Sequence, residues 1–283
     1  MLEMSERVHV RSRRSGSSPA LLLAPVGCAL VLALTGCGRS SGTAAAASVP
    51  PPARPTYTVM QMNLCLSGLA GCFGKVDYPA GVDEASARIG ELHPDAVTLN
   101  EVCSGDVAVI ARRTGYHVGF SRVIYEGQFL PCIHPRGRGL FGDAVLTRSA
   151  IKSTVSRAFE AQSGPERRRW LCARTGVGVD VCTAHLASAE ADEVAANDPQ
   201  CAELRTLLAR RAAAGTVIFG GDVNHRPSCA PRGFWSRADT FAHQNPGDQQ
   251  VYGTGAFRSP AARVLPAAHT DHDALLVGAH RLR

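Results

Sequence analysis

Three features are absent from this 283-residue sequence, and each absence excludes a class of structure. The longest apolar run, Leu21–Leu34, has the length of a signal-peptide core and is too short for a comfortable transmembrane helix. No internal repeat is visible, which excludes a solenoid or propeller array. No two cysteines have the Cys-x-x-Cys spacing, which disfavours a structural zinc site.

Lysine is also scarce, because Lys75 and Lys152 are the only lysines among 30 basic residues. Arginine suits bidentate contacts with phosphate, but a codon bias gives the same excess and is the interpretation that we favour. The formal net charge of +6 is compatible with phosphate-bearing substrates and too small to indicate nucleic-acid binding. A hydrophobic content of 45% with 19% charged residues is typical of an ordinary globular domain.

The N-terminal region indicates export. Arginines precede the apolar run, and Leu34-Thr35-Gly36-Cys37 resembles the bacterial lipobox, in which the cysteine is lipidated and becomes the first residue. Residues 1–36 are therefore predicted to be a lipoprotein signal peptide, with the mature protein outside the cell and anchored to the membrane through Cys37. Residues 37–56 are predicted to be a flexible Ala/Ser/Pro tether and residues 57–283 the folded domain. The alternative is an ordinary secreted protein that is cleaved nearby.

Cysteine usage agrees with export. Eight cysteines remain in the predicted domain, and an even number in an exported domain indicates four disulfides. They are Cys65, Cys72, Cys103, Cys132, Cys172, Cys182, Cys201 and Cys229. Eight cysteines allow about 105 pairings, and the sequence does not choose among them. Two local pairs are expected: Cys65 with Cys72 across a short loop, and Cys172 with Cys182 across a hairpin.

Helical and strand patterns alternate along the domain, which predicts an α/β fold with a mixed sheet core. The predicted strands are Thr58–Leu64, Asp95–Glu101, Tyr116–Ile124, Gly142–Thr147, Thr216–Phe219 and Ala274–Val277, with a hairpin over Trp170–Leu186. The predicted helices are Val82–Leu92, Gly105–Thr114 and a third around Leu204–Leu208.

Polar side chains gather where five of these strands meet a loop. The motifs are Gln61-Met62-Asn63, Leu99-Asn100-Glu101, Thr183-Ala184-His185-Leu186, Gly221-Asp222-Val223-Asn224 and Thr270-Asp271-His272-Asp273. Each motif alone has an ordinary explanation, such as a solvated glutamate at 101 or a buried, hydrogen-bonded histidine at 185. Gly220 and Gly221 are expected to form a turn that lets the backbone approach a ligand closely.

The five motifs in this order resemble the endonuclease/exonuclease/phosphatase superfamily, which has the deoxyribonuclease I-like fold, over Thr58–Val277. The resemblance implies a four-layer α/β/β/α sandwich, with two mixed sheets face to face and helices outside, and a metal-dependent phosphodiesterase. The metal residues that it implies are Asn63 (as ligand or orienter), Glu101 and Asp271, and the implied catalytic residues are His185, Asp222, Asn224 and His272. Asp222 would position the attacking water, while the other three would contact the phosphate. The implied metal is Mg²⁺, which prefers oxygen ligands, with Mn²⁺ or Ca²⁺ as alternatives.

One departure from the family pattern concerns the aspartate that orients a catalytic histidine. Gln249 occupies that position, and a neutral amide would orient the histidine without stabilising its charged form. Asp248 would substitute if the register shifted by one residue. His225, Arg226 and His269 match no motif and are expected at the surface or behind the site, and Arg167-Arg168-Arg169 is expected to be a solvated charge run.

The sequence therefore predicts an exported, monomeric Mg²⁺-dependent phosphodiesterase, with nucleic acid favoured over phospholipid as substrate. No long apolar insertion is present that would suit a sphingomyelinase-like phospholipid hydrolase, which is the first alternative. The second alternative is a non-catalytic binding lipoprotein on the same fold. Small phosphate esters, and endonuclease versus exonuclease action, are left open at this stage.

Overall fold

The computed structural model describes residues 56–188 and 192–282. The predicted signal peptide, Cys37 and all but the last residue of the predicted tether lie outside the described residues. Thr56, the last residue of the predicted tether, belongs to the first strand.

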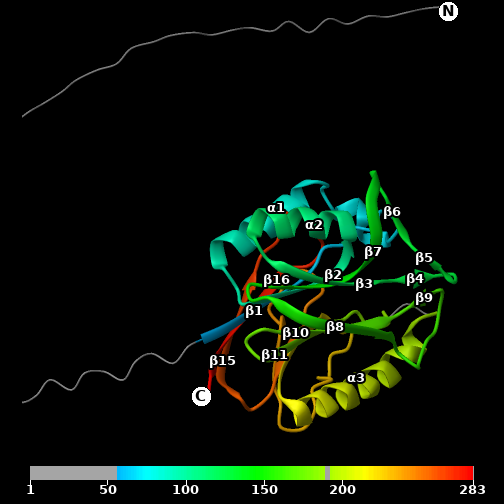
Figure 1. The fold of residues 1–283 in the computed structure, drawn as a ribbon. Coiled ribbons are helices and arrows are strands. Elements are labelled where there is room, and N and C mark those ends of the chain that lie inside the picture. Colours follow the sequence, from blue (N-terminus) through cyan, green and yellow to red (C-terminus); the bar gives the residue numbers. More distant parts are fainter. Residues whose placement is uncertain (1–55, 189–191, 283) are drawn as a thin grey trace, which may run out of the picture. The chain divides into compact units, whose positions relative to one another are not determined.

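Two large sheets form the centre of the domain (Figure 1). The strand order of the first sheet is β15-β16-β1-β2-β7-β3, and β6 pairs with β7 as an additional strand. In this sheet β1 and β2 are parallel, and all the other pairs are antiparallel. Its strands are β1 (Thr56–Asn63), β2 (Ala96–Cys103), β3 (His117–Arg122), β6 (Pro131–Ile133), β7 (Arg136–Thr147), β15 (Phe257–Leu265) and β16 (Ala274–Arg281).

The second sheet has the order β13-β14-β12-β11-β10-β8, and here β11 and β12 are the parallel pair. Its strands are β8 (Ile151–Ala158), β10 (Arg169–Thr175), β11 (Val179–Ala184), β12 (Thr216–Asp222), β13 (Trp235–Ala238) and β14 (Gln249–Gly253). A small third sheet joins β4 (Ile124–Tyr125), β5 (Gln128–Phe129) and β9 (Glu166–Arg167) beyond the ends of β3 and β8 (Figure 1).

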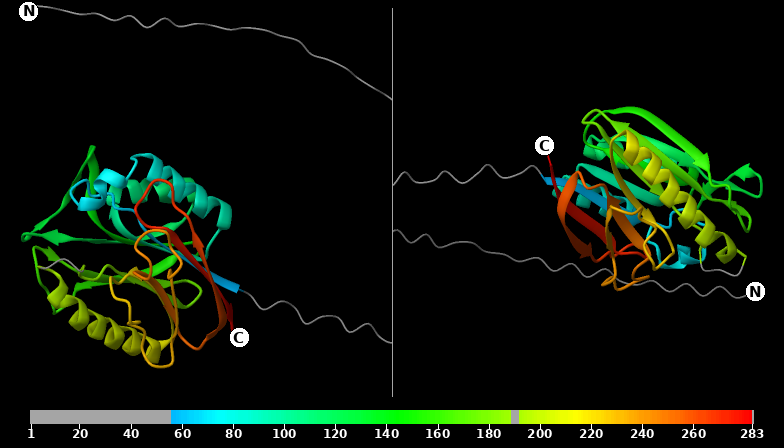
Figure 2. Two further views of the ribbon diagram at one scale, coloured as in Figure 1. Left: turned by 180° about the vertical axis from the view of Figure 1, so that it is seen from behind. Right: turned by 90° about the horizontal axis from the view of Figure 1, so that it is seen from below.

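Helices cover the outer faces of the two large sheets. The helix α1 (Ala80–Leu92) and the helix α2 (Ser104–Thr114) lie over the first sheet, and α3 (Val194–Ala214) runs along the second (Figures 1 and 2). A short 3₁₀ helix, η1 (Gly71–Lys75), precedes α1. The predicted four-layer α/β/β/α sandwich with two mixed sheets is therefore confirmed.

Apolar residues explain this layering, because each interface between layers buries its own cluster. Ile89 and Ile110 of α1 and α2 pack against strands of the first sheet, and Leu204 of α3 packs against the second. Between the sheets, residues such as Val145 and Leu171 face each other. The sandwich is thus held by three apolar layers, and its polar groups collect at one end.

Four disulfides link the eight cysteines of the domain. The expected pairs Cys65–Cys72 and Cys172–Cys182 are confirmed, and the structure adds Cys103–Cys132 and Cys201–Cys229. Four disulfides are typical of a protein that folds in an oxidising compartment outside the cytoplasm. Among the described residues, no helix combines the length and the apolar character needed to cross a bilayer.

The expected role of Gly220 and Gly221 is wrong, because both lie inside β12 and not in a turn beyond it. A Cβ on Gly220 would lie 2.3 Å from Thr98 Oγ1 in the facing sheet, and one on Gly221 would lie 2.3 Å from the Ala184 carbonyl oxygen. Such short separations are sterically forbidden. The two glycines therefore let the sheets and neighbouring strands approach each other, which brings Asp222 close to the residues of the opposite sheet.

Candidate active site

Strand topology brings the five polar motifs to one end of the sandwich. The parallel strands β1 and β2 end side by side near Asn63 and Glu101, since Asn63 is paired with Asn100. In the second sheet β12 ends at Asp222, which forms an isolated parallel bridge with His185 just after β11. The loop before β16 adds Asp271 and His272. All the residues predicted for the site therefore come from loops and strand ends at the same edge.

Asn63 connects the two carboxylates at the centre of this edge. Its Nδ2 donates hydrogen bonds to Glu101 Oε1 (2.7 Å) and to Asp222 Oδ2 (3.0 Å). Its Oδ1 accepts the backbone N–H of Cys65 at 3.1 Å. The amide nitrogen, and not the oxygen, thus faces the site, so Asn63 is placed to orient the two acids.

Glu101 occupies an unusual backbone position. The pairing of β2 with β7 shifts register between Leu99 and Val102, and Glu101 has a φ of 55° in the left-handed region. A bulge of this kind re-aims a side chain out of the regular pleat, and left-handed φ values in residues with a Cβ are concentrated at functional sites. Burial raises the pKa of Glu101 to about 7.

The carboxyl groups of Glu101 and Asp271 suit a hard divalent cation. Asp271 is 6% exposed, and its Oδ1 is buried with no hydrogen-bond partner among the residues that the structure describes. Burying carboxylate oxygen without a partner is costly, and a cation with oxygen ligands would remove that cost. A buried carboxylate oxygen of this kind fits Mg²⁺ as a ligand.

Asp222 is almost completely buried, at 1% exposure. Burial alone would raise its pKa, but His272 and the hydrogen bonds from the Asn63 side chain and the Asn224 backbone lower the pKa below its usual value. Asp222 Oδ1 accepts the backbone N–H of Asn224 at 3.2 Å, and Oδ2 lies 3.7 Å from His272 Nε2. Asp222 therefore remains a carboxylate and can accept a proton near neutral pH.

His185 has an unexpected partner in Arg168. The expectation that the arginine run is solvated is wrong for this residue, which is buried between Glu166 (2.8 Å) and Glu193 (2.7 Å). Its Nη1 lies 2.9 Å from His185 Nδ1, and since a guanidinium only donates, Nδ1 must accept. Burial, with the charge of Arg168, lowers the pKa of His185 to about 3.

The neutral ring of His185 consequently carries its proton on Nε2, which is the nitrogen that faces the site. This nitrogen lies 3.8 Å from Glu101 Oε1 and 3.1 Å from Asn224 Nδ2, which can only donate. Arg168 and Asn224 thus compete for the one ring lone pair, and a proton on Nε2 requires the Asn224 amide to turn away from His185. His185 is therefore a hydrogen-bond donor to the site and has no free lone pair for use as a base. The run of three arginines was the only feature of the sequence that pointed to Arg168. Nothing in the sequence indicates that the middle arginine of this run is the buried one.

The expectation that Gln249 orients a catalytic histidine is also wrong. Gln249 Nε2 donates to the Asp273 carbonyl oxygen, and its Oε1 accepts the backbone N–H of Asn63. Asp248 forms no hydrogen bond with His272 either. His272 Nδ1 has no partner among the described residues, and its Nε2 lies 3.2 Å from the amide of Asn245, a residue that sequence analysis missed.

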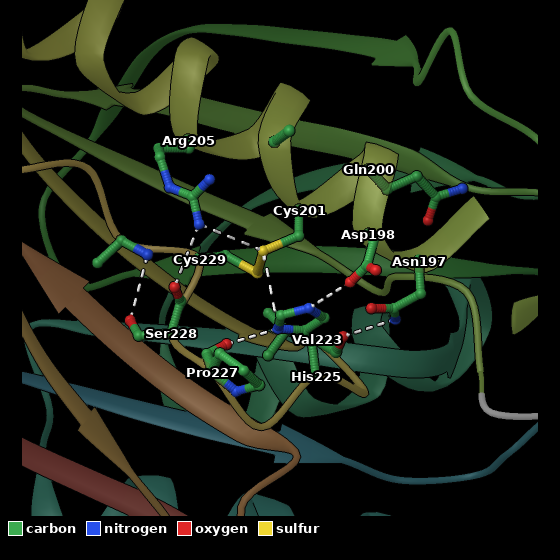
Figure 3. The surroundings of a disulfide bond; sticks show 12 residues. Asn197, Asp198, Gln200, Cys201, Arg205, Val223, His225, Pro227, Ser228 and Cys229 are labelled. Carbon is green, nitrogen blue, oxygen red and sulfur yellow. Dashed lines mark hydrogen bonds and ion pairs between the residues drawn. A yellow bond between two sulfur atoms is a disulfide. The ribbon is translucent and has the colours of Figure 1, made fainter. Parts of the chain in front are cut away.

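The loop after β12, which carries Asn224, is fastened to α3 (Figure 3). The disulfide Cys201–Cys229 links this loop to the helix, and Asn197 Nδ2 donates to the carbonyl oxygens of Val223 and Asn224. The His225 ring points away from Asp222 to Asp198, 2.7 Å from its Nε2. His225 thus acts behind the site, as expected.

A buried polar network lies beneath the site, between the two sheets. Asn100 Oδ1 accepts from Gln61 Nε2 (2.7 Å) and from the backbone N–H of Asp222 (2.8 Å). Asn100 Nδ2 donates to Asp143 Oδ1 at 2.8 Å, and burial raises the pKa of Asp143 to about 7. Asp143 therefore binds a proton more tightly in the folded protein than in the unfolded chain.

Replacing Asp143 with asparagine is expected to remove a pH dependence of stability. Between the usual aspartate pKa of about 3.9 and about 7, the folded protein keeps a proton that the unfolded chain loses, so the wild-type free energy of unfolding falls as pH rises. The variant should gain about 2 kcal/mol over wild type between pH 5 and pH 7.5. Urea unfolding of both metal-free proteins at the two pH values measures this gain, and parallel pH profiles would contradict it.

Comparisons with known proteins concern the family and the fold of the chain. The family model described as "Endonuclease/Exonuclease/phosphatase family" matches residues 70–272. An endonuclease/exonuclease/phosphatase from Beutenbergia cavernae is similar in structure, with a TM-score of 0.59 at 20% identity, covering 81% of this chain and 72% of that one. The human Nocturnin catalytic domain with bound sulfate gives a TM-score of 0.60 at 16% identity, covering 81% and 96%.

A third similar structure is that of D. rerio TDP2 complexed with single strand DNA product. Its TM-score is 0.55 at 15% identity, and the match covers 79% of this chain and 98% of that one. No curated protein sequence matches the chain.

Proposed function

The chain belongs to the endonuclease/exonuclease/phosphatase family, and from this premise we propose that it is a Mg²⁺-dependent phosphodiesterase with a nuclease-like substrate. One observation carries the proposal: Asn63 holds the carboxylates of Glu101 and Asp222 together, 2.7 Å and 3.0 Å from its Nδ2, at the edge where His185, Asn224 and His272 also meet. A non-catalytic binding module would have no need for this combination of acids and donors.

Each residue has a chemical task in the proposed reaction. Asp222 accepts the proton of the attacking water through its Oδ2, which makes the water oxygen a better nucleophile towards phosphorus. His185 donates its Nε2–H to a phosphoryl oxygen, and the Asn224 amide does the same. The new bond joins the water oxygen to phosphorus, and the bond to the leaving oxygen breaks. His272, 3.7 Å from Asp222, protonates that oxygen.

Glu101 and Asp271 would hold the metal, with Asn63 orienting Glu101. When bound, the cation neutralises charge on the phosphodiester and stabilises the charge that develops in the transition state. The protein's own contribution is a rigid arrangement, since Glu101 lies on a bulge and Asn63 and Asp222 are each 1% exposed. A fixed arrangement of donors and acids needs little reorganisation during the reaction.

Two finer points belong to the proposal. A nucleic-acid substrate is favoured over sphingomyelin, and the structure of D. rerio TDP2 with single strand DNA product supports this preference by analogy of fold. The mature protein would be a lipoprotein anchored outside the cell through Cys37, with residues 37–55 as the tether. The four disulfides support the exported location.

A substrate panel tests the proposal. The full chain, produced under oxidising conditions, is assayed with Mg²⁺ on a single-stranded DNA oligonucleotide, RNA, sphingomyelin vesicles and bis(p-nitrophenyl) phosphate. We expect hydrolysis of the nucleic acids and of the chromogenic diester, and its loss on addition of EDTA. Turnover that persists after chelation would refute the metal-dependent mechanism. A folded protein that is inactive on the whole panel would favour the binding module.

A further inference from the structure

A row of arginines and an aromatic ring lies on the small sheet β5-β4-β9 and on the adjoining ends of β3 and β10. Ile124 of the central strand β4 is paired with Phe129 on one side and with Arg167 on the other. Directly opposed residues of neighbouring strands point to the same face of a sheet, so Phe129 and Arg167 share one face. The guanidinium of Arg122 lies over the Phe129 ring, 4.1 Å from its centroid. Arg169 lies nearby, as its Nε donates to Ser121 at 3.4 Å.

This row borders the candidate active site. Arg122 ends β3 and is paired with Gly142, which is itself paired with Val102, the residue after Glu101. Arg167 of β9 and Arg169 of β10 flank Arg168, whose guanidinium reaches His185. The row therefore lies at the catalytic end of the sandwich, at the β3 and β8 edge.

The positive charges of this row are not neutralised by the protein. Among residues 56–188 and 192–282, no carboxylate forms an ion pair with Arg122, Arg167 or Arg169. The pKa of Arg169 is lowered by burial and, to a smaller extent, by the positive charge of Arg122. Arg168 shows the contrast, because it has Glu166 and Glu193 as partners within 2.8 Å. Adjacent guanidinium groups without a carboxylate repel each other, and an anion between them would remove the repulsion.

The ring of Phe129 provides a stacking surface next to these charges. It is 46% exposed, which is unusual for a phenylalanine in a strand. An exposed apolar side chain also suits a lipid surface, but one part of this ring lies under the Arg122 guanidinium, so no continuous apolar patch is presented. Aromatic rings interleaved with arginines are typical of surfaces that bind single-stranded nucleic acid, where bases stack and phosphates pair with guanidinium groups.

We propose that Arg122, Phe129, Arg167 and Arg169 form a subsite that binds the phosphate and the base of a nucleotide beyond the scissile phosphodiester. The substrate class is accordingly a single-stranded polynucleotide, since a duplex keeps its bases stacked within the helix and a small phosphate ester does not reach the row. This inference rests on the proposed phosphodiesterase function and specifies the substrate of the same site.

Equilibrium binding tests the subsite without turnover. A fluorescein-labelled single-stranded DNA 12-mer is titrated with the full chain in EDTA, and binding is followed by anisotropy. The double substitution Arg122→Ala/Arg169→Ala is expected to raise Kd at least tenfold, and to reduce the dependence of log Kd on log salt by about 0.7 for each phosphate that no longer pairs with an arginine. Phe129→Ala should raise Kd about tenfold, whereas Phe129→Trp should retain binding because it keeps a stacking surface.

Arg258→Ala is the matched control, because Arg258 is an exposed arginine near the start of β15, at the opposite end of the sandwich. If it weakens binding as much as the double substitution, the effect is one of general charge and the subsite is refuted. Binding to sphingomyelin vesicles that requires Phe129, without oligonucleotide binding, would assign the row to a membrane and also refute the proposal.

Turnover separates this inference from the proposed function. The double substitution should lower kcat/KM at least tenfold more for the 12-mer than for bis(p-nitrophenyl) phosphate, which has a single phosphodiester. If wild type hydrolyses both substrates and the two losses are equal, the subsite is wrong while the phosphodiesterase function stands. If wild type hydrolyses neither substrate, the function fails, and the binding titration alone decides the subsite.

Discussion

Replacing Asp222 with asparagine is expected to slow phosphodiester hydrolysis about a thousandfold, within the range of effects found for general bases. The substitution preserves size but removes the carboxylate that accepts hydrogen bonds from Asn63 Nδ2 and the Asn224 backbone and that lies 3.7 Å from His272. His185 is not placed to take its role, because the lone pair of its Nδ1 accepts a hydrogen bond from Arg168. Steady-state kinetics with bis(p-nitrophenyl) phosphate and Mg²⁺ measures the loss.

Asp180→Asn serves as the control for this experiment. Asp180 is a buried aspartate (7% exposed) in the same sheet, but it lies near the start of β11, far along the strands from the catalytic end. Losing its ion pairs with Arg174 and Arg211 should lower stability without lowering kcat. An Asp222→Asn protein that retains more than about a tenth of wild-type kcat would contradict the assignment of Asp222 as the base.

Replacing Glu101 with glutamine is expected to lower Mg²⁺-dependent activity about a thousandfold, since a bound metal contributes several kcal/mol of transition-state stabilisation. The same substitution should weaken Mg²⁺ binding, measured by isothermal titration calorimetry, by about a hundredfold. The fold should remain intact, because burial raises the pKa of Glu101 to about 7 and the metal-free protein gains nothing from its charge at pH 8. Thermal unfolding in EDTA at that pH tests this point.

Glu91→Gln on α1 is the matched control, since Glu91 is an exposed glutamate near the C-terminal end of that helix. It should leave both Mg²⁺ binding and kcat near the wild-type values. Unchanged Mg²⁺ affinity in the Glu101→Gln protein would show that other oxygens hold the metal. A loss of activity without a loss of affinity would instead assign Glu101 to the reaction itself.

The main elements of the fold follow from the sequence because their signals are local. The spacing of apolar residues predicts α1 and α2, and strand patterns predict β1, β2 and β16. Cysteines on either side of a short loop or turn predict the Cys65–Cys72 and Cys172–Cys182 disulfides. Short strands such as β4, β5 and β9 were missed. Two-residue strands carry no periodicity, and they exist only because the ends of β3 and β8 bring them together.

The remaining disulfides show the same limit. Cys103 and Cys132 are separated by 29 positions, and Cys201 and Cys229 by 28. Their pairing depends on how β2 lies against the β6 segment and how α3 lies against the loop after β12. Neither arrangement has a local signature in the sequence. The number of cysteines therefore predicts four disulfides, but the sequence does not show which cysteines form the last two.

For the site, the sequence by itself determined which chemical groups are present. Glu101, His185, Asp222, Asn224 and His272 stand at strand ends, and the order of the motifs indicated the family without any coordinates. These positions meet because β1 and β2, and likewise β11 and β12, are parallel pairs, and the carboxyl ends of parallel neighbours lie at the same edge of a sheet.

Only the tertiary structure decided how these groups act on one another. It turned the amide nitrogen of Asn63 towards two acids and placed Arg168 beside His185. It also left His272 Nδ1 without a partner among the described residues. The physical reason is that proton positions and pKa values depend on burial and on contacts across the two sheets. Such contacts join residues that are far apart in the chain and leave no pattern within it.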